Sequence, residues 1–253
     1  MNYKKGSDTK EVILRGSKEF FLENGFHAAT YRKLGAYLEI NPNLISYHFS
    51  SKKVLAETVL TDYFVAESRL LREHMEEAFS PMLKYAAQNR IHYKILASDE
   101  KLLRFYADVV SSDFLRDVFF SIPGIQDLHM DFFEYYGLEK KYPVAYYSAM
   151  ETASECEIVK FFQPSLYEDD QFLDFVGSIY PVFLGVPEEE IEKAFRQAKD
   201  ICERIDVKEF SFCRHVRGSN EPGINKCKKA AVFVQRKQRL FGFWFCCGRP
   251  KGR

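Results

Sequence analysis

Residues 41–52, with the sequence NPNLISYHFSSK, combine polar and aromatic side chains in one short stretch that carries almost no charge. The side chains in it that can donate or accept hydrogen bonds include Asn43, Ser46, Tyr47 and His48. A helix that faces a protein core would be more apolar, and a helix that faces only solvent would carry more charge. This mixture favours hydrogen bonding to a polar surface that approaches the helix closely.

Two short helices are expected to position these side chains. Thr30 is suited to cap the first helix, which has an apolar face formed by Tyr31, Leu34, Gly35 and Leu38. Asn41 is suited to cap the second helix, and Pro42 follows at the first helical position, which proline favours. A short helix, a tight turn and a second short helix form the helix-turn-helix plan, in which the second helix lies in the DNA major groove. An ordinary helical hairpin is the alternative.

In a major groove, the second helix needs one face for the DNA and one face for its own domain. Ile45 and Phe49 are the residues expected to hold the helix to the core, while Leu44 can contact a thymine methyl group. No Arg or Lys lies between Asn41 and Phe49, so the helix lacks the usual bidentate reader of guanine. We therefore expect the base preference to be less predictable than the position of the helix.

Three stretches around this unit form a longer motif: ILRGSKEFFLENGFHAATYRKLGAYL, INPNLISYHF and SSK. A long helix follows, capped by Ser50 or Ser51 and starting near Lys52. Together they resemble the DNA-binding domain of TetR-type transcriptional regulators over about residues 8–65, and beyond it only the all-helical layout and the length agree. The DNA-contacting residues that the resemblance implies are Thr30, Tyr31, Arg32, Asn41, Pro42, Asn43, Leu44, Ser46, Tyr47, His48 and Lys52.

The turn between the two short helices departs from this family at Glu39. The family usually has a small residue there, often glycine. A residue other than glycine that is forced into the left-handed conformation costs about 1–2 kcal/mol. Glu39 also brings a negative charge close to the proposed DNA face. We expect either a slightly different turn or a modest affinity for DNA.

The pattern of apolar residues and of Pro and Gly breaks predicts an all-α chain with three parts. Residues 1–64 form the helix-turn-helix domain, residues 65–213 a helical ligand-binding and dimerisation domain, and residues 214–253 a basic tail. We expect the first helix to begin at Asp8, which forms a capping-box pair with Glu11. The helical segments predicted in the second part are 81–97, 99–111, 112–121, 124–137, 143–163, 168–184 and 188–205.

The second part is rich in aromatic residues, which either form a bulky core or line a ligand cavity between helices. For any single residue the core is the simpler interpretation. The cavity hypothesis implies an unidentified small-molecule effector. The candidate lining residues are Tyr93, Phe105, Tyr106, Phe119, Phe132, Tyr136, Tyr146 and Tyr147.

Dimerisation is expected because one helix-turn-helix reads only half of a two-fold symmetric site. By position in the family, residues 168–205 are the candidates for a four-helix bundle between two subunits. The stretch FLDFVGSIYPVFLG is strongly apolar, and Gly177 and Ser178 would allow close approach. The alternative is that these segments only cover the core of their own chain.

The formal net charge is zero, but the charge is distributed unevenly. From Arg214 onward there are 11 Lys or Arg and one acid, Glu221, so acids exceed bases by about ten in the preceding residues. A wholly basic nucleic-acid binder is excluded, and any contact with DNA must be local. The tail has three interpretations: a disordered extension that adds non-specific DNA affinity, a membrane-surface segment acylated at Cys246 and Cys247, or a cloning or reading-frame product without an evolved role.

Enzymatic chemistry finds little support in the sequence. There is no nucleophile elbow, phosphate-binding loop or glycine-rich cofactor loop, so we predict no catalytic residue and no cofactor. Cys213, His215 and Cys227 match no common zinc spacing, and we predict no metal site. Six cysteines without a secretory leader favour a reduced cytoplasmic location, and no stretch is long enough to span a membrane.

These observations lead to one functional hypothesis and one alternative. The hypothesis is a cytoplasmic, dimeric, ligand-responsive regulator, more specifically a repressor, that binds double-stranded DNA at a near-palindromic operator. The alternative is a helical protein-interaction module that retains a helix-turn-helix. The operator, the effector and the regulated genes are not specified by the sequence.

Overall fold

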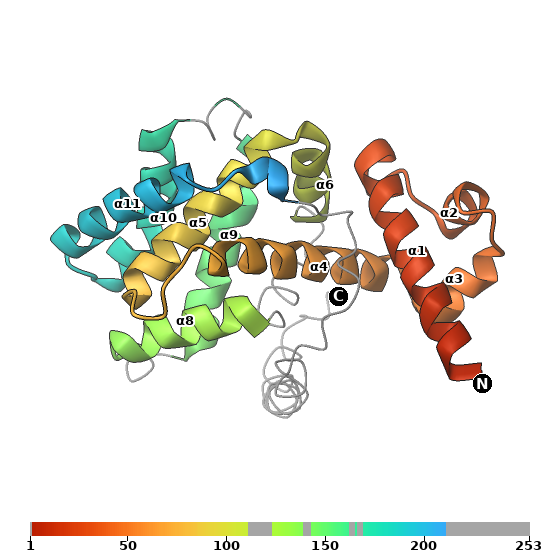
Figure 1. Cartoon of the computed structure of the whole chain (residues 1–253), viewed down its shortest axis with the longest axis horizontal. Helices are drawn as coiled ribbons and strands as arrows, with labels where there is room; N and C mark the ends of the chain where they lie inside the picture. Colours follow the sequence, from red (N-terminus) through yellow and green to blue (C-terminus); the bar gives the residue numbers. More distant parts are fainter. Residues whose placement is uncertain (1, 111–122, 139–142, 162–164, 166–168, 211–253) are drawn as a thin grey trace, which may run out of the picture. The chain divides into compact units, whose positions relative to one another are not determined.

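The computed structural model describes residues 2–110, 123–138, 143–161, 165 and 169–210, and the part of the chain so described is all-helical (Figure 1). The predicted all-α fold is therefore confirmed. The elements are α1 (Asn2–Asn24), α2 (Tyr31–Tyr37), α3 (Pro42–His48), α4 (Lys52–Arg72), α5 (Pro81–Ser98), α6 (Glu100–Val110), α8 (Pro123–Tyr135), α9 (Val144–Phe161), α10 (Asp170–Leu184), α11 (Glu188–Glu203) and the short 3-10 helix η3 (Val207–Glu209). The segment 112–121, Phe119 within it, and the tail 214–253 lie outside the described residues.

Local capping positions the helices of the N-terminal group. The Thr30 side chain accepts a hydrogen bond from the backbone N–H of Lys33 at 3.2 Å, and α2 begins directly after it. The Asn41 side chain caps α3 in the same way, with Pro42 as its first residue. Of the two serines that were considered for α4, Ser51 is the cap. The expected start of the first helix is wrong, because α1 begins at Asn2 and Asp8 lies inside it.

The N-terminal helices share a small aromatic and aliphatic core. Phe21, Leu34, Ile45 and Phe49 are all buried in it. Helices α2 and α3 approach closely at Gly35, where a Cβ atom would lie 2.8 Å from the Cγ atom of Pro42. This close approach fixes α3 against α2 and leaves the opposite face of α3 uncovered.

The turn between α2 and α3 contains Glu39, whose φ angle is 55°. Within the described part of the chain, every other residue with a positive φ angle is a glycine. The position of Glu39 therefore requires the left-handed conformation that favours glycine. Glu39→Gly is therefore expected to raise the free energy of unfolding by about 1 kcal/mol. Chemical denaturation of both proteins measures the difference, and the exposed Glu134→Gly serves as the control, which should destabilise α8 because it places glycine inside a helix. A loss of stability in Glu39→Gly would contradict the interpretation of this turn.

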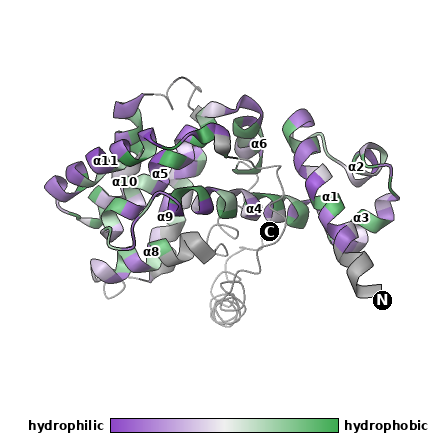
Figure 2. Cartoon of the chain, in the orientation of Figure 1, coloured by the Kyte–Doolittle hydropathy of each residue, from purple (hydrophilic) through white to green (hydrophobic). Residues whose placement is uncertain are grey.

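Helix α5 is the centre of the helical body behind the N-terminal group. It packs against α4, α6, α8, α10 and α11. Helix α4 packs on α1 as well as on α5 and α8, so it belongs to both groups. Apolar positions recur along the helices (Figure 2), as expected for elements that share one core. Among the helices that the structure describes, none combines the length and the apolar character needed to cross a lipid bilayer.

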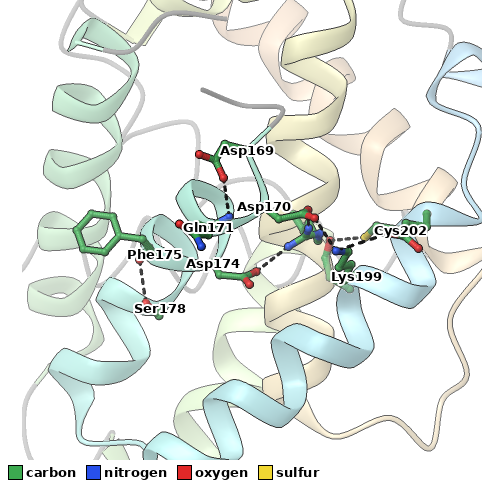
Figure 3. Close-up of polar contacts among 11 residues, drawn as sticks. Asp169, Asp170, Gln171, Asp174, Phe175, Ser178, Lys199 and Cys202 are labelled. Carbon is green, nitrogen blue, oxygen red and sulfur yellow. Dashed lines mark hydrogen bonds and ion pairs between the residues drawn. The ribbon is translucent and has the colours of Figure 1, made fainter. Parts of the chain in front are cut away.

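Helix α10 is fixed to α5 by a buried guanidinium group. Arg90 of α5 is buried, and its guanidinium bonds Asp170 and also Asp174, the latter at 2.6 Å (Figure 3). Lys199 of α11 binds the other carboxylate oxygen of Asp170, at 2.6 Å. These ion pairs set which face of α10 points toward its own chain.

Gly177 of α10 has a different role from the one that its sequence context indicated. A Cβ atom there would lie 2.5 Å from the ring of Phe195 in α11 of the same chain. The close approach that Gly177 permits is therefore between α10 and its own body. The side chains that α10 leaves exposed lie elsewhere on the helix, at Phe175, Val182 and Phe183.

Candidate nucleic-acid interface and effector cavity

Helix α3 has one buried face and one exposed face. Ile45 and the capping residue Phe49 are buried, as predicted. Tyr47 is the most prominent side chain on the exposed face, with 81% of its surface accessible. The other exposed residues of the helix and its cap are Asn41, Asn43, Leu44 and Ser46, and Pro42 and His48 are half-buried. Asn43, Leu44, Ser46 and Tyr47 are thus exposed together on α3, whereas Pro42 packs against Gly35 of α2.

Two contacts organise this surface. The rings of Tyr47 and His48 meet edge to face, with centroids 5.1 Å apart. The Ser46 hydroxyl donates a hydrogen bond to the Asn43 carbonyl oxygen at 3.0 Å. The amide side chain of Asn43 and the phenol of Tyr47 therefore project from a helix whose neighbouring groups are already fixed.

Tyr31 and Lys52 make hydrogen bonds inside the domain. The Tyr31 hydroxyl donates to the carbonyl oxygen of Phe49 at 2.7 Å, and burial raises the pKa of this phenol. The Lys52 ammonium donates to the carbonyl oxygen of Phe26 at 3.2 Å and lies 4.3 Å from the centre of the Phe26 ring. Burial lowers the pKa of Lys52, an effect that the negative charge of Asp108 opposes. Both side chains therefore also tie elements of the domain together, a role that their place in the motif did not indicate.

Helix α6 connects the N-terminal group to the body. The Asp108 carboxylate accepts a hydrogen bond from the backbone N–H of Phe26 at 3.0 Å. The ring of Phe105 stacks on the ring of Phe21, with centroids 5.5 Å apart and an interplanar angle of 9°. Arg104 donates to the carbonyl oxygen of Leu22 at 2.5 Å, at the end of α1. No local sequence signal marks this junction, because it joins residues about 80 positions apart.

A cavity of about 80 Å³ lies between helices of the body. Of the residues predicted to line a cavity, Tyr93 and Tyr106 do so. The others that the structure describes lie elsewhere: Phe105 and Phe132 are buried in the core, Tyr147 is buried against Phe133, Tyr136 is half-buried beside Glu190, and Tyr146 is exposed. The remaining lining residues include acids, histidines and amides that sequence reasoning missed, because helix packing alone brings them together.

A buried network of acids, histidine and tyrosines forms one wall of this cavity. His92 Nδ1 lies 2.8 Å from a Glu67 carboxylate oxygen, and His92 Nε2 lies 3.5 Å from Glu155. The hydroxyls of Tyr93 and Tyr106 donate to the two oxygens of Glu155. Burial alone would lower the pKa of His92, but Glu67 and Glu155 outweigh it and raise the pKa to about 10. His92 is therefore an imidazolium at neutral pH.

A second set of polar groups lies on the α8 side of the cavity. His129 Nε2 of α8 is 2.9 Å from a Glu151 carboxylate oxygen. The Tyr85 hydroxyl of α5 donates to the other oxygen of Glu151 at 3.4 Å, and burial raises the pKa of this phenol well above its usual range. The two sets together give the cavity several hydrogen-bonding groups within aromatic walls.

Comparison with known proteins decides what the N-terminal group is. The model of the family described as "Bacterial regulatory proteins, tetR family" matches residues 13–59. The N-terminal domain is a tetR-family domain. The match spans α2, α3 and the start of α4, and so includes every residue that was predicted to contact DNA.

Curated relatives share this tetR-family domain. The HTH-type transcriptional regulator UidR of Escherichia coli (strain K12) is 35% identical over 52 residues, which are 21% of this chain and 26% of UidR. The UidR of Shigella flexneri matches to the same extent. The chain thus spans about a quarter of the length of the curated relatives it matches, and the likeness is confined to that region.

Solved structures extend the similarity of fold to the body behind the tetR-family domain. RolR, crystallised in complex with resorcinol, has a TM-score of 0.57 at 15% identity, covering 82% of this chain and 99% of RolR. A putative tetR family regulator from Shewanella sp. PV-4 has a TM-score of 0.50 at 12% identity, covering 68% and 95%. At such identities the likeness shows a shared fold: a tetR-family helix-turn-helix followed by a helical body.

Proposed function

We propose that the chain is a cytoplasmic, dimeric regulator of transcription, acting as a repressor, which binds a near-palindromic operator and responds to a small molecule. The observation that carries the proposal is the exposed polar face of α3, held in a tetR-family domain by Ile45 and Phe49. The name of UidR, a transcriptional regulator that shares this domain, supports it.

The proposed contact with DNA places α3 in the major groove. Tyr47 and Asn43 then offer a phenol and an amide to base edges or phosphates, and Leu44 offers a methyl contact to thymine. Thr30 and Arg32 lie at the start of α2, where they are exposed and suited to the phosphate backbone. Because α3 carries no Arg or Lys, the proposed specificity depends on amide and apolar contacts together with the shape of the DNA.

Pairing of two subunits is proposed through the outer face of α10, together with α11. The apolar side chains Phe175, Val182 and Phe183 are 62%, 59% and 59% exposed, and their spacing places them on one side of the helix. A contiguous apolar face of this kind marks an interaction surface. A second copy is the proposed occupant, because two recognition helices are needed to read successive major grooves about 34–36 Å apart.

Phe183→Asp is expected to weaken dimerisation by about tenfold or more, because it places a charge in the centre of an apolar interface. Sedimentation velocity over a concentration series measures the dimer dissociation constant. Met130→Asp, on the exposed side of α8, is the matched control and should leave the dimer unchanged. Equal effects of the two substitutions would contradict the assignment of the interface to α10.

Helix α6 offers a route from the cavity to the DNA-binding domain. Tyr106 on one side of this helix lines the cavity and donates to Glu155 at 3.1 Å. The adjacent Phe105 stacks on Phe21 of the tetR-family domain, and Asp108 holds the backbone N–H of Phe26. In the proposed response, an effector shifts α6, α4 tilts with the domain, and the separation of the two recognition helices changes. The effector acts only through its different affinities for the two conformations.

Selection of bound sequences from a random DNA pool tests the DNA-binding part of the proposal. The expected product is a two-fold symmetric sequence with half-sites one helical turn apart. Failure to enrich any sequence above background would favour the alternative of a helical protein-interaction module that retains a helix-turn-helix.

A further inference from the structure

The cavity in the helical body contains more acidic than basic side chains. Its described lining includes three carboxylates, Glu67, Glu151 and Glu155, and two imidazoles, His92 and His129, but neither lysine nor arginine. The described lining thus holds three carboxyl groups against two imidazoles. An uncompensated charge that is shielded from water is unfavourable, so a cation would stabilise this arrangement.

Three of the residues that line the cavity have a buried polar atom without a hydrogen-bond partner in the described part of the chain. The Tyr180 hydroxyl and the Thr152 hydroxyl have no hydrogen-bond partner within the described part of the chain, and these residues are only 4% and 8% exposed. The Asn89 side-chain oxygen is also buried without a partner there. All three residues line the cavity. Native proteins leave few buried polar atoms unsatisfied, so these atoms indicate that a polar group of a ligand completes the site.

Glu151 and Glu155 are the carboxylates best placed to bind that group. They lie one turn apart on α9, so their side chains leave the same face of the helix. All three carboxylates already have hydrogen-bonding partners in the chain, so exposure is what separates them. The Glu151 and Glu155 side chains are 15% and 14% exposed, whereas the Glu67 side chain is 1% exposed. Thr152 directly follows Glu151 in the chain, and Tyr180 lines the same cavity.

The walls of the cavity restrict the rest of the ligand. Phe64, Tyr85 and Tyr180 are among the aromatic side chains that line it. Aromatic faces attract cations as well as apolar groups. The volume of about 80 Å³ is small beside the volumes of drug-sized sites, so the ligand must be compact.

We propose that this cavity binds a small organic amine, with its ammonium group between Glu151 and Glu155 and its apolar part against the aromatic rings. An ammonium group has three N–H donors and no acceptor, which suits two carboxylates and the oxygen of the Tyr180 hydroxyl. An anion would be repelled by the excess of acidic side chains, and a neutral alcohol would leave that excess without a compensating positive charge. The proposal deepens the proposed function, on which it rests for the biological role of the ligand.

Three probes of similar size and different charge test the proposal on the full chain without DNA: n-butylammonium, 1-butanol and butyrate. Binding is followed by the shift of Tm and by calorimetric titration, in buffer that contains EDTA to exclude metal-mediated effects. We expect n-butylammonium to raise Tm in a saturable manner, with no comparable rise from the other two. An equal or larger rise with 1-butanol or butyrate, or no rise with any probe, would overturn the proposal.

Two substitutions locate the site, and a third serves as a control. Glu151→Gln is expected to weaken n-butylammonium binding by roughly ten- to a hundredfold, as for the loss of a charge-assisted hydrogen bond. Tyr180→Phe keeps the ring, removes an uncommitted hydroxyl and should also weaken binding, so the test survives if Glu151→Gln folds poorly. Glu134→Gln makes the same change as Glu151→Gln at an exposed position of α8 and should leave binding unchanged. If Glu151→Gln folds well and both variants bind n-butylammonium as tightly as the unmodified chain, the amine binds elsewhere.

A parallel titration with the selected DNA separates this proposal from the proposed function. Saturable amine binding without specific DNA binding would support the cavity assignment and contradict the regulator. Specific DNA binding without amine binding would contradict only the cavity assignment. Both the cavity assignment and the regulator would be supported if n-butylammonium releases the DNA from the wild-type chain but does not release it from Glu151→Gln.

Discussion

Tyr47→Ala is expected to weaken binding to the selected operator by about ten- to a hundredfold, the effect of losing a contact worth about 1–3 kcal/mol. Tyr47 is 81% exposed on α3, so its phenol ring contributes little to the core. The free energy of unfolding should therefore change by no more than about 0.5 kcal/mol. Fluorescence anisotropy at one fixed salt concentration measures the affinity, because binding to DNA depends steeply on salt.

A matched tyrosine distinguishes this loss from a general surface effect. Tyr135 of α8 is 60% exposed, and Tyr135→Ala removes the same side chain away from α3. We expect its affinity for the operator to equal that of the unmodified chain. Tyr47→Phe further separates the hydroxyl from the ring. An operator affinity that survives Tyr47→Ala would count heavily against α3 as the recognition helix.

His92→Gln is expected to lower the free energy of unfolding by about 3–5 kcal/mol, because it leaves the buried Glu67 without its charged partner. His92 is buried and its Nδ1 atom lies 2.8 Å from Glu67. Urea denaturation at neutral pH measures the loss. His74→Gln is the control, since His74 is exposed just beyond the end of α4. A loss equal to that of the control would contradict a stabilising ion pair at His92.

The same histidine predicts how stability depends on pH. The pKa of His92 is raised from 6.5 in the unfolded chain to about 10 in the folded chain. Its stabilising contribution is therefore fully present below pH 6.5 and is lost as pH rises toward about 10. The free energy of unfolding should fall through this window in the unmodified chain and fall less in His92→Gln. Parallel falls in the two proteins would show that another group titrates.

Local features of the N-terminal domain could be predicted from the sequence because they depend on neighbouring residues. Thr30 and Asn41 cap α2 and α3 as predicted, since a capping side chain bonds a backbone N–H two or three residues away. The strained position of Glu39 was predicted from the residue type that the turn usually contains. The start of α1 was wrong because Asp8 and Glu11 form a capping pair in sequence while the chain before them is already helical.

Features that depend on helix packing could not be predicted in this way. The network at the cavity joins Glu67, His92 and Glu155, which come from three helices, and no spacing rule relates them. Gly177 was interpreted as a contact point for a second subunit, whereas its close neighbour is Phe195 of its own chain. Lys52 was assigned to DNA contact from the motif, and its bond to the Phe26 carbonyl oxygen became visible only in three dimensions.

The bond between Asp108 and the backbone N–H of Phe26 makes one amide proton a spectroscopic probe of the junction between the N-terminal group and α6. Phe26 lies in the turn directly after α1, and its amide is expected to exchange with solvent when this turn separates from α6. Its exchange rate and chemical shift therefore report the separation of α6 from the end of α1 directly, without DNA, a label or a known effector. A screen of candidate small molecules by NMR could follow this single resonance.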